Sequence, residues 1–125
     1  MLIDSNIIIY AAKPEHAALR RFVAERAPTM SAISYVEVLG YHKLIEQERE
    51  YLEAFFAVAE MLTISGDVLE RAVALRQERK MTLGDAIIAG TALAHDAVLA
   101  TRNTKDFEWV KGLRLFNPFA TEPTS

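Results

Sequence analysis

Residues 1–10 of the chain read MLIDSNIIIY and place an acid inside an otherwise apolar run. Three apolar residues lead directly into Asp4, two polar residues follow, and apolar residues then resume. We interpret residues 2–4 as the beginning of a buried strand and residues 6–12 as a short helix. At this junction Asp4 is a turn residue, a helix cap or part of a functional site.

Length and composition favour one compact domain with a substantial core. The chain has 125 residues, of which 51% are hydrophobic, so disorder is not expected. The formal charge is -3, whereas nucleic-acid-binding proteins usually carry a basic surplus, so any such contact would depend on a local basic rim. The absence of cysteine excludes disulfides and thiolate zinc sites, and it is typical of proteins in a reducing cytoplasm.

The sequence contains no pattern for secretion or membrane insertion. The N-terminus has no basic region and reaches an acid at Asp4, so no signal peptide is expected. The longest membrane-like run, residues 86–94, is about half of the roughly 20 residues that a membrane-spanning helix needs. We therefore predict a cytoplasmic protein with no membrane partner.

Hydrophobic periodicity along the rest of the chain predicts alternating strands and helices. The further strands are expected at residues 29–34, 62–65, 97–102 and 112–118. The further helices are expected at residues 16–27, 34–47, 49–61, 67–79 and 83–96. This alternation predicts a single α/β domain with a mainly parallel central sheet over residues 1–125, with a loose tail from about residue 120.

Polar residues that can bind metal fall at or after the carboxyl ends of the expected strands, which meet at one edge of a parallel sheet. They are Asp4, Glu37, Asp85, Asn103 and Asp106. Carboxylates gathered in one cleft raise each other's pKa, and a divalent cation relieves this repulsion. Magnesium prefers oxygen ligands and can activate water for attack on a phosphodiester. The chain has no cysteine and no His-x-x-x-His pair, so oxygen ligation is the metal chemistry that it offers.

Each acid also fits a purely structural role. Ser34-x-x-Glu37 and Thr82-x-x-Asp85 both match a capping box, in which the acid bonds free N–H groups of its own helix. Asp106 fits a solvated turn. The structural and functional interpretations are compatible, because the first turn of a helix is also where a ligand site forms.

Five motifs run in order along nearly the whole chain: LIDSNIIIY, SYVEVLG, LGDAIIAGTAL, AVLATRNTKDF and LRLFNPF. Together they resemble the PIN-domain ribonucleases, and most closely the VapC-type toxins of type II toxin–antitoxin pairs. The resemblance implies a three-layer α/β/α sandwich. It also implies hydrolysis of RNA phosphodiesters by metal-activated water, with Mg²⁺ or Mn²⁺ as cofactor.

The resemblance also implies roles for individual residues. Asp4 and Asp85 match the main metal ligands, and Glu37 matches the residue that completes the ligand shell directly or through water. Ser5 occupies a position that is often Thr in the family, where the hydroxyl orients the site, and Asn6 follows it as in the family.

The segment after the fourth strand departs from the family pattern. Many members have an acid where this chain has Asn103, and Asp106 is the candidate to replace it. We therefore expect one well-held ion, with a second recruited by the substrate phosphate. Arg102 and Lys105 flank the expected site, where they either contact RNA phosphates or form a solvated basic edge.

The resemblance further implies a cognate antitoxin and a homodimer. The apolar stretch 51–56, YLEAFF, either belongs to such an interface or simply fills the core. Two other functions stay open: a PIN nuclease of RNA processing without an antitoxin, and a non-catalytic PIN-like scaffold. Retention of Asp4, Glu37 and Asp85 favours catalysis, and the small size of the chain favours the toxin.

Overall fold

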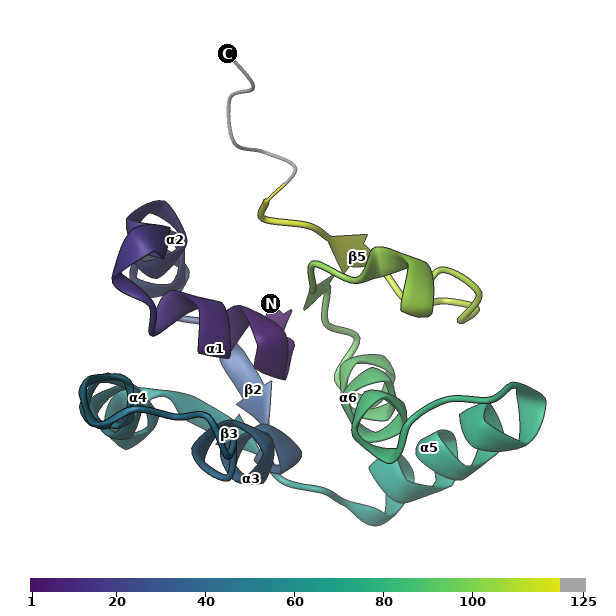
Figure 1. The fold of residues 1–125 in the computed structure, drawn as a ribbon. Helices are drawn as coiled ribbons and strands as arrows, with labels where there is room; N and C mark the ends of the chain where they lie inside the picture. Colours follow the sequence, from purple (N-terminus) through teal and green to yellow (C-terminus); the bar gives the residue numbers. More distant parts are fainter. Residues whose placement is uncertain (120–125) are drawn as a thin grey trace.

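The structure is a computed structural model that describes residues 1–119 (Figure 1), and the tail expected from about residue 120 lies outside the described residues. The strands are β1 (Leu2–Ile3), β2 (Thr29–Ser31), β3 (Glu60–Leu62), β4 (Leu99–Ala100) and β5 (Leu115–Phe116). The α-helices are α1 (Ser5–Ala11), α2 (Ala17–Arg26), α3 (Ala32–Leu39), α4 (Glu46–Val58), α5 (Gly66–Glu78) and α6 (Leu83–Ala94). Two short 3-10 helices are η1 (Pro14–His16) and η2 (Thr104–Asp106).

The five strands form one sheet in the order β3-β2-β1-β4-β5, and all neighbouring pairs are parallel. The predicted α/β class with a mainly parallel sheet is confirmed. The chain moves outward from β1 to β3 and then crosses to β4 on the other side, so the strand order reverses between β1 and β4. In open parallel sheets ligands bind at this point, beyond the carboxyl ends of the strands.

The sheet separates two apolar layers. On β1, Ile3 packs with residues of α1, α2 and α4, whereas its neighbour Leu2 packs with residues of α5 and α6. Successive side chains of a strand point to opposite faces, so this two-residue strand contributes to both layers. Figure 1 shows α1, α2 and α4 on one side of the molecule and α5 and α6 on the other. Helix α3 contacts both α1 and α6, which places it where the two layers meet at the sheet edge.

Several predicted boundaries differ from those in the structure. The expected strand at 29–34 ends at Ser31, because the Ser31 side chain accepts a hydrogen bond from Ile33 N and begins α3 there. The helix expected at 34–47 therefore lies at 32–39 and is followed by a turn before α4. The strand expected at 62–65 lies instead at 60–62. It is the outer strand of the sheet and largely exposed, so it lacks the apolar run of a buried strand.

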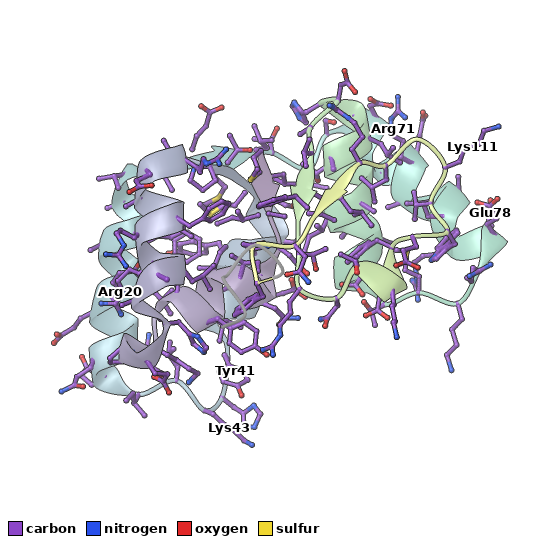
Figure 2. The ribbon with its side chains drawn as sticks, turned by 90° about the horizontal axis from the view of Figure 1, so that it is seen from above. Arg20, Tyr41, Lys43, Arg71, Glu78 and Lys111 are labelled. Carbon is purple, nitrogen blue, oxygen red and sulfur yellow. The ribbon has the colours of Figure 1, made fainter. Side chains whose placement is uncertain are left out.

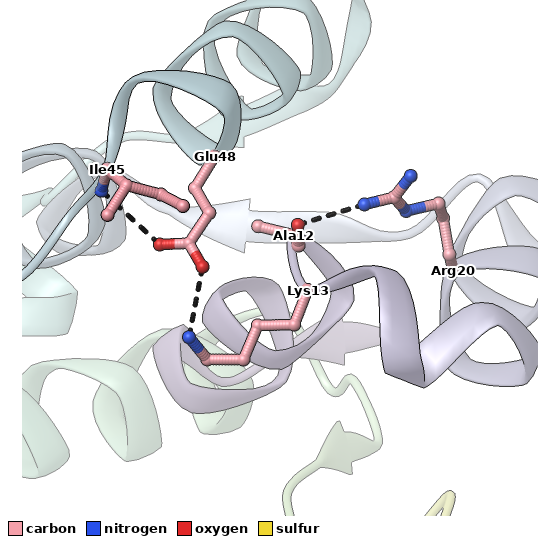
Figure 3. Close-up of polar contacts among 5 residues, drawn as sticks. All are labelled: Ala12, Lys13, Arg20, Ile45 and Glu48. Carbon is pink, nitrogen blue, oxygen red and sulfur yellow. Dashed lines mark hydrogen bonds and ion pairs between the residues drawn. The ribbon is translucent and has the colours of Figure 1, made fainter.

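An ion pair with one buried partner joins the segment after α1 to α4. Glu48, in the first turn of α4, is 8% exposed. Its carboxylate lies 3.0 Å from Lys13 Nζ and accepts a hydrogen bond from Ile45 N at 3.4 Å (Figure 3). Arg20 adds a hydrogen bond from its guanidinium to Ala12 O, at 2.9 Å, in the same region. These contacts connect the end of α1 to α2 and α4.

Charged side chains cover the outside of the molecule. Figure 2 shows Lys43, Glu78 and Lys111 pointing away from the ribbon, and all three are exposed. Within residues 1–119, no helix combines the length and apolar character that crossing a bilayer requires.

Candidate active site

Four of the predicted acids come within electrostatic reach of one another at the carboxyl edge of the sheet. Asp4 directly follows β1, Glu37 lies on α3 after β2, and Asp85 lies in the first turn of α6. The negative charges of Asp85 and Glu37 both raise the pKa of Asp4. Asp106, on η2, and Glu37 both raise the pKa of Asp85. Segments far apart in the sequence therefore form one acidic edge, which we define as Asp4, Glu37, Asp85 and Asp106.

Asp4 is the most buried member of the acidic edge, at 3% exposure. Burial raises its pKa to about 6, and the charges of Asp85 and Glu37 add to this effect. A hydrogen bond from Thr101 Oγ1 to Asp4 Oδ2, at 2.8 Å, and one from the Ser5 backbone amide act in the opposite direction. None of the ion pairs among residues 1–119 includes Asp4. Among the described residues, the interactions that stabilise its negative charge are therefore hydrogen bonds.

Glu37 is an exposed residue whose carboxylate is nevertheless held by a hydrogen bond. Ser5 Oγ donates to Glu37 Oε1 at 2.7 Å, and the same Ser5 oxygen lies 2.8 Å from Ser34 Oγ. Ser5 and Ser34 are both buried, whereas Asn6 is exposed beside them. The predicted orienting residue, Ser5, thus contacts one acid through its side chain and another through its backbone.

At α6 the threonine half of the predicted capping box is present, whereas the capping box predicted at α3 is wrong. Thr82 Oγ1 accepts a hydrogen bond from Asp85 N at 3.2 Å, as expected for an N-cap. Ser34, by contrast, lies inside α3, because Ser31 begins that helix. The Glu37 carboxylate therefore bonds Ser5 and does not cap its own helix.

Asp4 occupies the N-cap position of α1 without capping it through its side chain. The side chain turns instead toward Thr101 on the neighbouring strand segment. Asp85 is partly buried, and burial is the main cause of its raised pKa, which the Thr82 hydroxyl opposes. Both acids thus combine a place at a helix start with an environment that disfavours their charge.

The segment after β4 forms the outer rim of the acidic edge. Asn103 is exposed, and its backbone N–H donates to Thr101 Oγ1 at 3.1 Å, so it holds the hydroxyl that contacts Asp4. Asp106 and Lys105 follow on η2 and are exposed. Asp106 is therefore a turn residue in contact with solvent, as the structural interpretation expected, and its charge still acts on Asp85.

Arg102 is exposed on the same rim and stacks on two aromatic rings. Its guanidinium carbon lies 5.2 Å from the ring centre of Tyr10 and 4.6 Å from that of Phe119. Such contacts orient an arginine without neutralising its charge. Arg102 therefore presents a fixed positive group beside the acidic edge.

Sequence reasoning missed Thr101 and Ser34. Ile3 pairs with Ala100 in the sheet, so Thr101 lies beside Asp4 one residue beyond the pair. A hydroxyl residue at the end of a predicted strand was the available signal for Thr101. Ser34 precedes Glu37 by three residues, which places the two on one helix face, but this spacing was assigned to capping.

The donor atoms of the acidic edge suit a hard divalent cation. Within residues 1–119, no group of three or more His, Asp or Glu side chains is arranged to hold a metal ion as the side chains lie. Magnesium commonly uses one or two carboxylates and keeps several waters. Asp4 and Asp85, whose pKa values neighbouring negative charges raise, are the two carboxylates whose chemistry suits such an ion.

Comparisons with known proteins identify the family of the chain. A curated relative from Shigella flexneri, the tRNA(fMet)-specific endonuclease VapC, is 31% identical over 90% of this chain and 93% of its own length. A toxin–antitoxin complex from Klebsiella pneumoniae has a chain with 34% identity and a TM-score of 0.72, and the match covers 94% of this chain and 96% of that one. VapBC2 from Rickettsia felis, solved with a DNA fragment from its promoter, has 25% identity and a TM-score of 0.79, over 93% and 96% of the two chains. The PIN domain family itself matches residues 1–113, and the chain belongs to this family.

Proposed function

We propose that the chain is a metal-dependent endoribonuclease and the toxin of a type II toxin–antitoxin pair. One observation carries the proposal. Asp4 is buried at the point where strand order reverses, its pKa is raised to about 6, and the nearest charges are those of other acids. Among residues 1–119, no ion pair involves an acid of this edge, and an edge that gathers unpaired carboxylates suits a cation brought by the solvent or the substrate.

Asp4 and Asp85 would hold Mg²⁺ or Mn²⁺, and Glu37 would complete the ligand shell directly or through water. When bound, the ion would activate water and neutralise the charge of the phosphate. The chain's own residues orient the acids. Thr101 fixes Asp4 through Oδ2, and Ser5 fixes Glu37 through Oε1. Glu37 remains accessible to solvent, so it can hold a water molecule by a hydrogen bond for attack in line with the scissile bond.

RNA is the proposed substrate, and Arg102 and Lys105 are the proposed phosphate contacts. Both are exposed on the rim of the acidic edge, and the stacked guanidinium of Arg102 can reach a phosphate without a large loss of side-chain freedom. Transfer RNA is the first RNA to test, because the curated relative is a tRNA-specific endonuclease. Asn103 supplies no charge for a second ion, so we retain one well-held ion, with a second recruited by the phosphate.

The proposed partners are a cognate antitoxin and a second copy of the chain in the cytoplasm. The support is that two related chains were solved as a toxin–antitoxin complex and as VapBC2. The YLEAFF stretch divides between the core and a groove that we propose as a partner surface. Leu52 and Phe56 are buried in the core, whereas Tyr51 and Phe55 line an apolar groove of about 600 Å³ between α2 and α4. Val58, at the rim of this groove, is 86% exposed and suits contact with an apolar antitoxin segment.

A non-catalytic scaffold is the second candidate, and two observations favour it. Asn103 is neutral where many family members have an acid, and no three acids are arranged around one ion among the described residues. A scaffold would bind RNA or a partner without cutting.

The test uses purified chain with total transfer RNA, with magnesium or with EDTA. The nuclease proposal expects magnesium-dependent cleavage that Asp85→Asn reduces by at least about 100-fold while the thermal unfolding midpoint stays near that of the parent. RNA binding without cleavage, under conditions where the protein is folded, would instead support the scaffold.

The toxin role has a separate test in living cells. Expression of the parent chain should arrest bacterial growth, and expression of the small neighbouring gene should relieve the arrest. Asp85→Asn should not arrest growth. Cleavage in vitro without any growth arrest would indicate the antitoxin-independent RNA-processing nuclease.

A further inference from the structure

The Glu37 side chain has a defined environment although the residue is exposed. On one side, Ser5 Oγ donates to Oε1 at 2.7 Å. On the other side, the carboxylate lies against Gly84 in the first turn of α6. A long exposed glutamate normally samples several rotamers, so two independent contacts at its end call for a reason.

The hydrogen bonds on the first side form a relay with one direction. Ser5 has a single hydroxyl proton, and an ionised carboxylate has none to give, so Ser5 donates to Glu37. The contact of 2.8 Å between Ser34 Oγ and Ser5 Oγ must then be a donation from Ser34. Ser34 is 0% exposed, so water does not compete for its proton. Ser34 thus orients Ser5, and Ser5 orients Glu37.

The contact on the second side depends on the missing side chain of Gly84. A Cβ atom at this position would collide with Glu37 Oε2 and would lie 3.0 Å from Glu37 Cδ and 3.3 Å from Glu37 Oε1. Within 4 Å, the three nearest atoms all belong to the Glu37 carboxyl group. An alanine here would therefore meet the Glu37 carboxyl group first and displace it.

Gly66 is a close structural match that lacks this contact. It lies in the first turn of α5, after the N-cap Ser65, as Gly84 lies in the first turn of α6 after Thr82. A Cβ at Gly66 would meet nothing within 4 Å. Gly66 is the first residue of its helix and Gly84 the second, so both lie in a first turn, and what separates them is the carboxyl group beside Gly84.

We propose that Ser34 and Gly84 are positioning residues that set the Glu37 carboxylate for RNA cleavage. The inference rests on the proposed nuclease function and adds to it two residues that touch neither substrate nor metal. Cleavage requires reacting groups to be held close to one geometry, and a displacement of about 1 Å can reduce a rate by about 100-fold. The relay and the space at Gly84 together leave the carboxylate one arrangement.

Gly84→Ala is expected to reduce kcat for RNA cleavage by about tenfold or more. Its unfolding midpoint should change as in Gly66→Ala, because the displaced group is the free end of a flexible side chain. Gly66→Ala should keep the parental kcat. Ser34→Ala should reduce kcat by roughly three- to tenfold with little change in KM, because Ser5 remains to bond Glu37 but is no longer held.

Ser31→Ala is the matched control for Ser34→Ala. Ser31 is also 0% exposed and lies at the start of the same helix, where it accepts from Ile33 N and does not contact Glu37. It should lower stability through the lost cap while kcat stays at the parental value.

Double variants separate a positioning role from general damage. In a Glu37→Gln background, Gly84→Ala and Ser34→Ala should cause little further loss of kcat, because their effect passes through the carboxylate. Equal losses in both backgrounds would overturn the inference. So would parental kcat in both single variants while Glu37→Gln is impaired.

A crystal structure of Gly84→Ala provides a readout that does not depend on cleavage. We expect Glu37 Oε1 to move out of hydrogen-bond distance of Ser5 Oγ, and an unmoved carboxylate would overturn the inference. If the parent chain cuts no RNA, the proposed function fails by itself, and this structure still decides whether Gly84 sets the position of Glu37.

Discussion

Two buried carboxylates of this chain lie in opposite electrostatic environments. Glu48 is 8% exposed and lies 3.0 Å from the ammonium group of Lys13 (Figure 3). Asp4 is 3% exposed, and the charges that act on it belong to Asp85 and Glu37. The pKa of Lys13 is raised by its hydrogen bond to Glu48, whereas the pKa of Asp4 is raised to about 6 by burial and by its acidic neighbours.

The difference indicates what each region is for. At Glu48 the chain supplies its own cation, so the pair can join α1 to α4 without any other component. At Asp4 the chain supplies one hydroxyl donor, one backbone N–H donor and more negative charge. Burial and negative neighbours lower the stability of the folded protein when Asp4 is ionised and no cation is bound. Such an arrangement is typical of functional sites that a cation from solution completes.

The largest expected effect is on cleavage. Asp4→Asn should reduce magnesium-dependent RNA cleavage by at least about 100-fold, equivalent to about 3 kcal/mol of transition-state stabilisation. Glu48→Gln makes the same change of carboxylate to amide at the other buried site and should retain the parental rate within about twofold. Cleavage rates measured below the unfolding midpoints of all three proteins test the pair. Similar losses in both variants would show that the acidic edge is not special.

Asp4→Asn should also stabilise the fold when divalent ions are absent. The pKa of Asp4 in the folded protein, about 6, is above its ordinary value of 3.8, so the folded state disfavours the ionised form. This penalty is absent below about pH 4, grows between pH 4 and 6, and is complete above pH 6. The free energy of unfolding of the variant should exceed that of the parent by about 1–3 kcal/mol at pH 7.5 and by less at pH 5, as measured by urea unfolding in EDTA. A variant less stable than the parent at pH 7.5 would contradict the account.

Glu48→Gln should have the opposite effect on stability. The amide can still accept the hydrogen bond from Ile45 N but loses the attraction to Lys13, whose side chain is 33% exposed. Because solvent screens this pair, the expected loss is only about 1 kcal/mol. In the Glu48→Gln background, Lys13→Met should cause little further loss of the free energy of unfolding. A double-mutant cycle of urea unfolding measures this. An unchanged free energy of unfolding would mean that the pair does not join the helices.

The smallest expected effect is stabilisation by magnesium. A ligand of the folded state adds about 0.4 kcal/mol when its concentration equals its dissociation constant. The parent and Glu48→Gln should both gain stability as magnesium rises, and Asp4→Asn should gain much less. Unfolding midpoints at several magnesium concentrations provide the measurement. Equal gains in all three proteins would locate the ion away from Asp4.

The sheet and the acidic residues could be predicted from sequence, because both follow from local patterns. Strand and helix periodicities placed most elements near their observed positions, and Asp4 and Asp85 were found as acids at the ends of such elements. The beginning of α3 could not be decided in this way, since Ser31 and Ser34 both fit an N-cap. The structure begins the helix at the first of them, where the pairing of β2 with β3 ends.

The contacts that orient the acids depend on tertiary structure and were not predictable. Thr101 reaches Asp4 because β1 and β4 are neighbours in one particular register, which no local pattern encodes. The approach of Glu37 to Gly84 likewise requires α3 and α6 to pack at the sheet edge. A glycine in the first turn of a helix gives no signal of its own, since Gly66 also lies in a first turn and has no such neighbour.

A crystal soaked in Mn²⁺ tests most directly whether the acidic edge holds a cation. We expect an anomalous difference peak between the carboxylates of Asp4 and Asp85, and its loss in crystals of Asp4→Asn soaked in the same way. We expect no peak beside Glu48, where Lys13 already provides the positive charge. Manganese bound elsewhere in the crystal, with none at Asp4 and Asp85, would contradict the central claim.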